Sequence, residues 1–273
     1  MSDNRPLAVI DSGIGGLAYL SWIQEFLPQE TLVYLADRKN FPYGTKTPAQ
    51  VLEAVSEGVE KLQHHYHPKA LVVACNTASV VALQDLRRRF DFPIVGVVPA
   101  VKPGAQASKN HILGILATDR TIQDPYIQNL IHTYALGQKV VAFGASDLVT
   151  HVEEDYMNPD PVARKTLLDS WAQKFLKEKA DVVVLGCTHF LHISQELQTA
   201  LGPDVKIVDS RDGVGKQTRK VLTEKGLLAQ EKSGADVFYI TAGADQKNEL
   251  DQWQEKYAVF AKRFHLEYRG VLE

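Results

Sequence analysis

The sequence is poor in residues that cross-link a fold, span a membrane or attract nucleic acid. Its 273 residues include two cysteines and two methionines, and no apolar run approaches the ~20 residues that a transmembrane helix needs. A formal net charge of −3 gives no electrostatic basis for binding nucleic acid or a membrane surface. Residues 1–6 lead straight into an apolar strand and lack the apolar core of a signal peptide. We therefore expect a cytoplasmic protein with no nucleic-acid or membrane partner, whose cysteines stay reduced rather than form a disulfide.

Motifs for metal, phosphate and cofactor binding are also missing. Two cysteines without a Cys-x-x-Cys spacing do not supply the four ligands of a structural zinc site, and His64, His65 and His67 fit a solvated helix end better. The sequence contains neither a Gly-x-Ser-x-Gly elbow nor a P-loop. No lysine stands out in a strand-end loop as an attachment point for pyridoxal phosphate. We expect neither a metal nor a cofactor.

The two cysteines occupy similar segments, residues 71–79 and 183–190. Each segment has an apolar, β-branched run, a small residue, the cysteine, and then side chains with hydroxyl, amide or imidazole groups. A buried strand that ends in a thiol places the sulfur at the edge where open α/β sheets bind ligands. Alternatively, both thiols are ordinary core residues, as free cysteines often are. Equivalent positions in two similar units favour one cleft with a sulfur on each wall.

Strand-like and helix-like segments alternate along the chain in two similar series. Strands are expected at residues 7–10 and 31–36, up to Cys75 and at 94–97, and again at 112–117 and 139–143, up to Cys187 and at 206–210. This order predicts an α/β fold of two pseudosymmetric domains, with largely parallel sheets and helices on both faces. The segment 99–104 is the expected crossover, and 144–156 is an expected loop. Helices are expected at 78–90 and from Pro48, with Thr47 as the N-cap. Elements at 214–222, 237–241 and 248–264 have no counterpart in the second series. We therefore assign residues 1–98 plus 210–273 to a first domain and 99–209 to a second.

A glycine-rich loop follows the first strand, with the sequence Asp11-Ser12-Gly13-Ile14-Gly15-Gly16. Together with Asp37 at the end of the next strand, it imitates a permissive dinucleotide-binding fingerprint. However, a carboxylate just before the glycines would repel a pyrophosphate, and a dinucleotide would leave both cysteines unexplained. The alternative is that the glycines let the loop turn tightly and approach a small ligand.

Two opposed thiols suit a reaction with proton transfers on opposite faces of one carbon. One thiolate removes an α-proton while the other thiol delivers a proton to the far face, which inverts the configuration. An ordinary thiol pKa of about 8.5 leaves both protonation states accessible near neutral pH. Asp11 near Cys75 and His189 near Cys187 are the expected modulating groups. The groups expected to hydrogen-bond an amino-acid substrate are the side chains of Ser12, Asn76, Thr77 and Thr188 and the backbone near Gly44.

Taken together, these segments resemble the glutamate racemases of the cofactor-independent aspartate/glutamate racemase superfamily. The matching stretches, in the family's order, are residues 11–17, 42–44, 74–79, 186–190 and 208–210. The resemblance implies interconversion of L- and D-glutamate without a cofactor, which supplies D-glutamate for peptidoglycan. It also implies two α/β domains with the site between them, and a homodimer.

The same resemblance implies roles for single residues. Cys75 and Cys187 are the two acid/base catalysts, and Asp11 and His189 support them. Glu153 matches a family glutamate near the second cysteine, with Glu154 beside it as the alternative. The substrate-contacting positions are Asp11, Ser12, Tyr43, Gly44, Asn76, Thr77, Thr188 and His189. The sequence departs from the family pattern at Leu191 and Arg211, where proline and glycine are usual, and in the loop 38–41.

Simpler roles are open for three of these residues. Asp11 can be a turn former, His189 can cap the following helix, and Glu153 can be a surface acid. Three other functions are also open: racemisation of aspartate or hydantoins, binding of an amino acid without catalysis, and hydrolysis through Cys187 and His189.

Overall fold

The computed structural model describes residues 3–155, 160–243, 246 and 248–273. The chain divides into two compact units, unit 1 formed by Met1–Val97 with Arg211–Glu273, and unit 2 formed by Val98–Ser210. Each boundary lies one residue from the position expected from the sequence. The C-terminal elements therefore return to the unit that the N-terminus begins.

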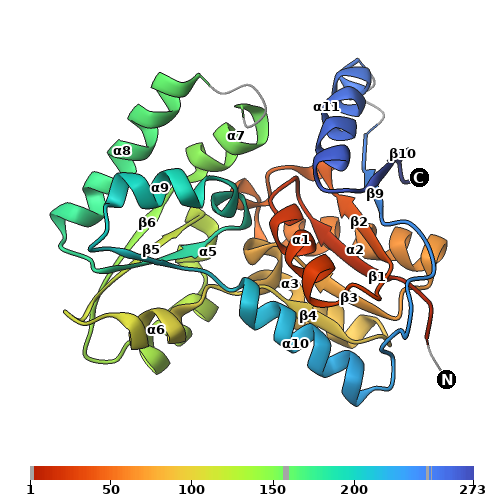
Figure 1. Cartoon of the computed structure of the whole chain (residues 1–273), viewed down its shortest axis with the longest axis horizontal. Coiled ribbons are helices and arrows are strands. Elements are labelled where there is room, and N and C mark those ends of the chain that lie inside the picture. The colour runs from red at the N-terminus through yellow and green to blue at the C-terminus, as the bar shows by residue number, and fades with distance from the viewer. Residues whose placement is uncertain (1–2, 156–159, 244–245, 247) are drawn as a thin grey trace. The chain divides into compact units, whose positions relative to one another are not determined.

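Unit 1 is built on a six-stranded sheet in the order β10-β9-β2-β1-β3-β4, and all its strand pairs are parallel. The strands are drawn as arrows in Figure 1. Their bounds are β1 Leu7–Asp11, β2 Leu32–Ala36, β3 Ala70–Val73, β4 Ile94–Gly96, β9 Val237–Ile240 and β10 Glu267–Val271.

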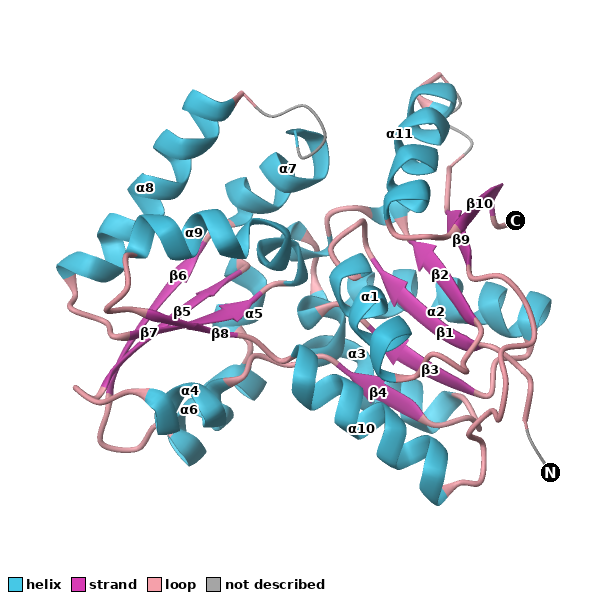
Figure 2. Ribbon diagram, viewed as in Figure 1, coloured by secondary structure: helices cyan, strands magenta, loops and turns pink. Residues whose placement is uncertain are grey.

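Helices cover both faces of this sheet, as Figure 2 shows for the cyan elements around its magenta strands. Their bounds are α1 Leu17–Phe26, α2 Pro48–Tyr66, α3 Asn76–Arg89, α10 Arg211–Glu224 and α11 Leu250–Arg263. Ala8 and Ile10 of β1 join a core cluster with apolar residues of α2 and α3, while Leu7 and Val9 are equally buried on the opposite face. A strand covered on both faces has to be apolar throughout, which explains the unbroken run at residues 7–10.

Unit 2 repeats this architecture on a four-stranded parallel sheet in the order β6-β5-β7-β8. Leu113, Ile115 and Ala117 face a core cluster that includes residues of α4 and α6. On the other face, an added Cβ at Gly114 would lie 2.7 Å from the ring of Phe175 in α8. The bounds are β5 Ile112–Ala117, β6 Lys139–Gly144, β7 Val182–Gly186, β8 Lys206–Val208, α4 Val101–Ala107, α5 Asp119–Gln123, α6 Pro125–Tyr134, α7 Ser146–Asp155, α8 Pro161–Lys177 and α9 Ser194–Leu201.

The two sheets share one strand order. Strands β2-β1-β3-β4 of unit 1 correspond, place by place, to β6-β5-β7-β8 of unit 2. In both, the order reverses between the first and third strands of the series, which is the switch point where open α/β sheets bind ligands. The chain leaves β1 at Asp11 and approaches Cys75 at the end of β3, and it leaves β5 at Ala117 and approaches Cys187 at the end of β7. Each unit therefore carries one cysteine beside its own switch point.

Several expectations about local structure were wrong. The segment expected to be a loop at 144–156 contains the helix α7. The crossover expected at 99–104 does follow the boundary between the units, but it also contains the start of the helix α4. The helix after Cys75 begins at Asn76, two residues earlier than the apolar pattern indicated, and β10 was not expected at all. By contrast, the predicted start of α2 is confirmed, because Thr47 caps it in a reciprocal capping box with Gln50. No helix in the described ranges is long and apolar enough to cross a membrane.

Candidate active site

Cys75 lies at the junction of β3 and α3. Its backbone is extended, with φ −139° and ψ 120°, and the helix starts at the next residue. The thiol is buried, with 6% of the residue exposed. N–H groups in the first turn of a helix have no carbonyl partner within the helix, so such a terminus binds anionic groups readily. We call Cys75 and the residues around it the first half-site, and Cys187 and the residues around it the second. The first half-site therefore places a thiol next to a helix N-terminus that is suited to binding a carboxylate.

Asn76 is a buried amide whose bonding capacity is unmet. The residue is 2% exposed, and neither its side-chain oxygen nor its nitrogen has a hydrogen-bond partner. Leaving a buried polar group unpaired costs ~1–3 kcal/mol, so such groups usually have a ligand or another functional reason. Its position directly after Cys75 makes this amide a strong candidate for a ligand-binding group. Thr77, the next residue, is also buried.

Asp11 ends the neighbouring strand. Its Oδ1 accepts a hydrogen bond from the backbone N of Ser12 at 2.6 Å and one from the Ser12 hydroxyl at 3.4 Å. A Cβ added at Gly16 would lie 2.9 Å from the Cβ atoms of both Asp11 and Ala74. The glycine is thus needed where the loop after β1 packs against the ends of β1 and β3. This close approach accounts for Gly16 without a dinucleotide.

Tyr43 and Gly44 lie in a short 3-10 turn, η2 (Tyr43–Thr45). The turn directly follows a cis peptide bond between Phe41 and Pro42. The Tyr43 hydroxyl donates to Oδ2 of Asp37 at 2.6 Å, and the hydroxyl of Thr241 donates to Oδ1 at 2.6 Å. Burial raises the pKa of Asp37, although the hydrogen bonds it accepts oppose this. Burial and the Asp37 carboxylate raise the pKa of Tyr43 well above its usual value, so the hydroxyl stays protonated.

Replacement of Tyr43 by phenylalanine is expected to lower the free energy of unfolding by ~1–3 kcal/mol, because Asp37 loses a donor while it stays buried. Urea unfolding measures this loss. The matched control is Tyr126→Phe, which changes a tyrosine that is 39% exposed. Equal midpoints for the two variants would show that the Tyr43–Asp37 bond contributes nothing.

The second half-site contains a short relay of three buried side chains. Cys187 directly follows β7, and His189 lies in the 3-10 segment η3 (Thr188–Ile193) that comes next. The Sγ of Cys187 and Nδ1 of His189 are 4.0 Å apart, while Nε2 of His189 lies 2.9 Å from Oε2 of Glu153 in α7. Glu153 is fully buried and Glu154 is exposed, so Glu153 is the acid that belongs to the half-site.

His189 carries a proton over a wide pH range in this environment. Burial disfavours the imidazolium, but the neighbouring Cys187 and Glu153 outweigh it and raise the pKa of His189 to about 10. An imidazolium beside a sulfur stabilises the thiolate form and can return a proton to it. The resting half-site therefore has a cation within reach of Cys187 at neutral pH.

Replacement of Glu153 by glutamine is expected to lower the pKa of His189 by at least about one unit, because the buried imidazolium loses its charged partner. An NMR titration of the His189 ring measures this change, with Glu154→Gln as the control. Because the folded pKa is raised, His189 stabilises the fold fully below about pH 6.5, and this contribution is lost as pH rises through about 10. A ring that titrates near 6.5 in the wild-type protein would contradict the relay.

Two threonines missing from the sequence-based site prediction lie at the corresponding place in unit 2. Thr118 is the first residue after β5, and both Thr118 and Thr121 are buried. The Thr118 oxygen accepts a hydrogen bond from the backbone N of Thr121 at 3.2 Å and caps α5. The signal that points to them is the repeat itself, since Thr118 is the first residue after β5, as Ser12 is the first residue after β1. Thr188, a predicted contact residue, is also buried at this edge.

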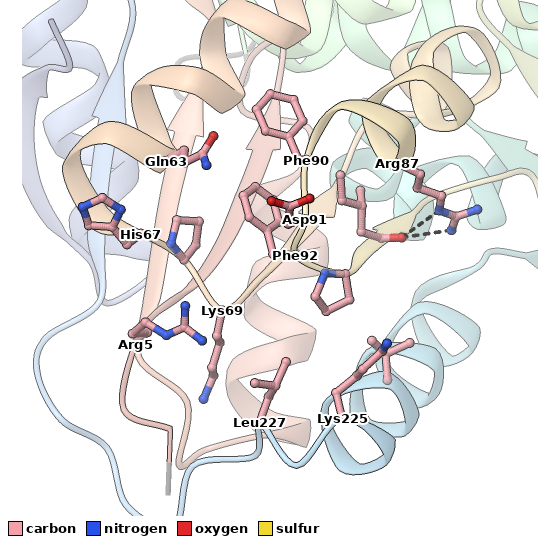
Figure 3. A pocket seen from close by; sticks show the side chains of 14 residues that line it. Arg5, Gln63, His67, Lys69, Arg87, Phe90, Asp91, Phe92, Lys225 and Leu227 are labelled. Atoms are coloured by element: carbon pink, nitrogen blue, oxygen red, sulfur yellow. Dashed lines mark hydrogen bonds between the residues drawn. The ribbon is translucent and has the colours of Figure 1, made fainter.

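A pocket of about 700 Å³ in unit 1 lies away from these residues. It is lined by Arg5, Lys69 and Ile94, which precede or begin β1, β3 and β4, so it opens at the amino-terminal edge of the sheet. Figure 3 shows its side chains, with Arg87 donating two hydrogen bonds to the carbonyl of Ile94. The cysteine lies at the opposite edge, so this pocket is not part of the candidate site.

The predicted residues thus gather at the carboxyl edge of each sheet. Within unit 1, Asp11, Ser12, Cys75, Asn76 and Thr77 cluster at the ends of β1 and β3. Within unit 2, the relay joins three of the predicted residues directly. In the part of the chain that the structure describes, no group of three or more His, Cys, Asp or Glu side chains is arranged to hold a metal ion.

Comparison with known proteins shows which family and which relatives this chain resembles. A family model described as Asp/Glu/Hydantoin racemase matches residues 17–213. The chain is 40% identical over 219 residues to a glutamate racemase of Pectobacterium atrosepticum, a match that covers 79% of this chain and 76% of that protein. It is 38% identical over 250 residues to the glutamate racemase of Escherichia coli K12, covering 90% and 87% of the two chains.

Solved structures give the same likeness. The crystal structure of E. coli glutamate racemase in complex with L-glutamate and the activator UDP-MurNAc-ala matches with a TM-score of 0.87 and 33% identity, over 98% of both chains. Glutamate racemase from Francisella tularensis, in complex with D-glutamate, matches with a TM-score of 0.79 and 26% identity, over 99% of both chains.

Proposed function

Because the chain belongs to the Asp/Glu/Hydantoin racemase family, we propose that it is a glutamate racemase, which interconverts L- and D-glutamate. The observation that carries the proposal is the recurrence of a buried thiol beside the switch point of each of two sheets with the same strand order. Identity of 40% and 38% to two glutamate racemases supports glutamate as the substrate.

In the proposed reaction, the two half-sites act on one substrate molecule from opposite faces. The thiolate of one cysteine takes the α-hydrogen as a proton, and the electron pair is delocalised into the adjacent carboxylate. The thiol of the other cysteine then donates its proton to the opposite face of the α-carbon. The product is the other enantiomer, and the cysteines have exchanged protonation states. Because the reverse reaction uses the same groups in exchanged roles, each cysteine must serve as both acid and base.

The supporting residues have distinct roles in this proposal. The imidazolium of His189 stabilises the Cys187 thiolate, and Glu153 holds the imidazolium in place. Asp11 is the corresponding group for Cys75. Asn76, whose amide lacks a partner, is proposed to bind the substrate together with Ser12, Thr77, Thr188 and the backbone at Tyr43 and Gly44. No step requires a metal or cofactor, and we propose that the enzyme supplies D-glutamate for peptidoglycan from the cytoplasm as a homodimer.

The test is a circular-dichroism assay of purified protein with L- or D-glutamate and no added cofactor. Either enantiomer is expected to lose its signal and reach the racemate, since the equilibrium constant of a racemisation is one. In deuterium oxide the α-position should acquire deuterium. Aspartate is the comparison substrate, because the matching family includes aspartate racemases. Faster turnover of aspartate than of glutamate would overturn the choice of substrate, and absence of solvent exchange would overturn the racemase itself.

A further inference from the structure

Arg164 connects the first turn of α8 to the last turn of α7. Its Nε donates to Nε2 of His151 at 3.3 Å, and one of its terminal nitrogens donates to the backbone carbonyl of Asp155 at 3.4 Å. Another terminal nitrogen lies 3.7 Å from a carboxylate oxygen of Glu196. Arg164 is 8% exposed, which is unusual for an arginine on a helix with a solvent-facing side. Such a buried guanidinium, bonded to two residues of one neighbouring helix, fixes that helix in place.

The first turn of α8, which carries Arg164, has a well-defined geometry. Pro161 opens α8, and the Asp160 side chain caps it by accepting hydrogen bonds from the N–H groups of Val162 at 2.9 Å and Ala163 at 3.1 Å. An arginine one residue further on therefore starts from a rigid first turn. The carbonyl that it reaches belongs to the last turn of α7, where helix carbonyls have no partner within the helix and favour a cation.

The imidazole of His151 bridges Arg164 and Asp155, which fixes the orientation of the ring. Because Nε2 accepts a hydrogen bond from Arg164, the ring carries its proton on Nδ1, which faces the Asp155 carboxylate at 3.0 Å. His151 thus links Arg164 to the same turn a second time. An amine in place of the guanidinium has a single nitrogen and cannot keep the fork that reaches both the ring and the carbonyl.

The turn that Arg164 holds contains Glu153. This residue is fully buried, and its carboxylate lies 2.9 Å from His189. The helix α7 also packs against η3, the segment that carries His189. A small shift of the last turn of α7 would therefore lengthen the Glu153–His189 bond while leaving Cys187 in position at the end of β7.

We propose that Arg164 is a positioning residue, which locks the last turn of α7 so that Glu153 stays bonded to His189 and keeps the Cys187 half-site competent. The inference rests on the proposed function where it concerns turnover, but its structural part concerns only Glu153 and His189. In this proposal Arg164 affects His189 only through Glu153, so it is not a catalytic residue.

The experiment compares Arg164→Met with Arg164→Lys and with the control Lys165→Met. Lys165 neighbours Arg164 on α8, but it is 77% exposed and pairs with Asp169 on its own helix. Arg164→Met is expected to lower kcat about ten- to a hundredfold with little change in KM, because misplacement rather than lost substrate binding is the cause. Arg164→Lys is expected to fall between the wild type and the methionine variant, and Lys165→Met to match the wild type.

A double-mutant cycle with Glu153→Gln separates positioning from general stability. If Arg164 acts through Glu153, adding Arg164→Met to Glu153→Gln changes kcat less than about twofold, whereas independent effects would multiply. The NMR titration midpoint of His189 should also fall in Arg164→Met, by part of the drop seen in Glu153→Gln. A merely structural role would lower the unfolding temperature and leave this midpoint unchanged.

Multiplying effects on kcat, or an unchanged His189 midpoint, would overturn the positioning role. If Arg164→Met does not fold, Arg164→Lys carries the same comparison, because it keeps the positive charge. If the wild-type protein does not racemise glutamate, the proposed function fails but the His189 midpoint still decides the role of Arg164. The two proposals can therefore fail separately.

Discussion

Replacement of Cys75 or Cys187 by alanine is expected to abolish racemisation, with each variant losing at least about 10²–10⁴-fold in kcat/KM. Inversion requires proton removal on one face and delivery on the other, and in the proposed mechanism each thiol serves one face. Neither thiol is expected to replace the other, because Cys75 follows β3 and Cys187 follows β7, which belong to different sheets. The circular-dichroism assay with each enantiomer measures the loss.

Solvent exchange gives the two variants opposite signatures. A single remaining thiolate can remove the α-proton of the enantiomer whose hydrogen faces it, exchange that proton with deuterium oxide, and return a deuteron to the same face. Cys187→Ala should therefore exchange the α-hydrogen of one enantiomer without inversion, and Cys75→Ala should exchange that of the other. Each variant is the matched control for its partner. Racemisation at the wild-type rate by either one, or exchange of the same enantiomer by both, would rule out the two-thiol mechanism.

Replacement of Lys69 by methionine is expected to destabilise unit 1 by ~3–5 kcal/mol, because it leaves the Glu30 carboxylate buried without its countercharge. The Nζ of Lys69 lies 2.5 Å from Oε2 of Glu30, and both side chains are fully buried. Lys69 also donates to the carbonyl of Asp3 at 2.7 Å, and Glu30 accepts from the backbone N of Ala229 at 2.9 Å. The pair thus connects the N-terminus, the entries to β2 and β3, and the segment after α10.

Hydrogen exchange of backbone amides in increasing urea measures this loss unit by unit. Protection of β1 and β3 should fall, while protection of β5 in unit 2 serves as an internal reference. The control variant Lys39→Met breaks the exposed pair with Glu57, in which the two side chains are 37% and 42% exposed, and should cost less than about 1 kcal/mol. The double variant Glu30→Met with Lys69→Met should recover much of the stability, because it removes both buried charges. A single variant as stable as Lys39→Met would mean that the pair contributes nothing net.

The order of strands and helices was predictable because it depends on local pattern. Apolar runs that end in Cys75 and Cys187 mark strands covered on both faces, and the cap at Thr47 with Pro48 marks a helix start. The helix α7 was missed because its sequence is largely polar, although the buried residues Leu148 and Val152 lie one helical turn apart. Likewise, Pro103 and Gly104 suggested a break, yet a proline is compatible with the first turn of a helix such as α4.

The contacts that complete the half-sites were less accessible from the sequence. Glu153 lies 36 positions from His189, and Thr241 lies 204 positions from Asp37, so no periodicity within one element reports that they meet. The family resemblance assigned a role to Glu153, but it assigned none to Arg164 or Asp37. Such partners depend on which helices pack together, which the sheet order decides only after the whole unit has folded.

The shared strand order of the two sheets has an evolutionary consequence. Two parts of one chain that follow the same path are the pattern left when a gene is copied and the copies fuse. The ancestral protein would then have been a half-length chain with a single thiol, so the two-thiol mechanism proposed here would have required two such chains. After such a fusion the two copies can diverge: β1 now ends at Asp11 and β5 at Ala117, and Cys187 lies beside His189, which contacts Glu153.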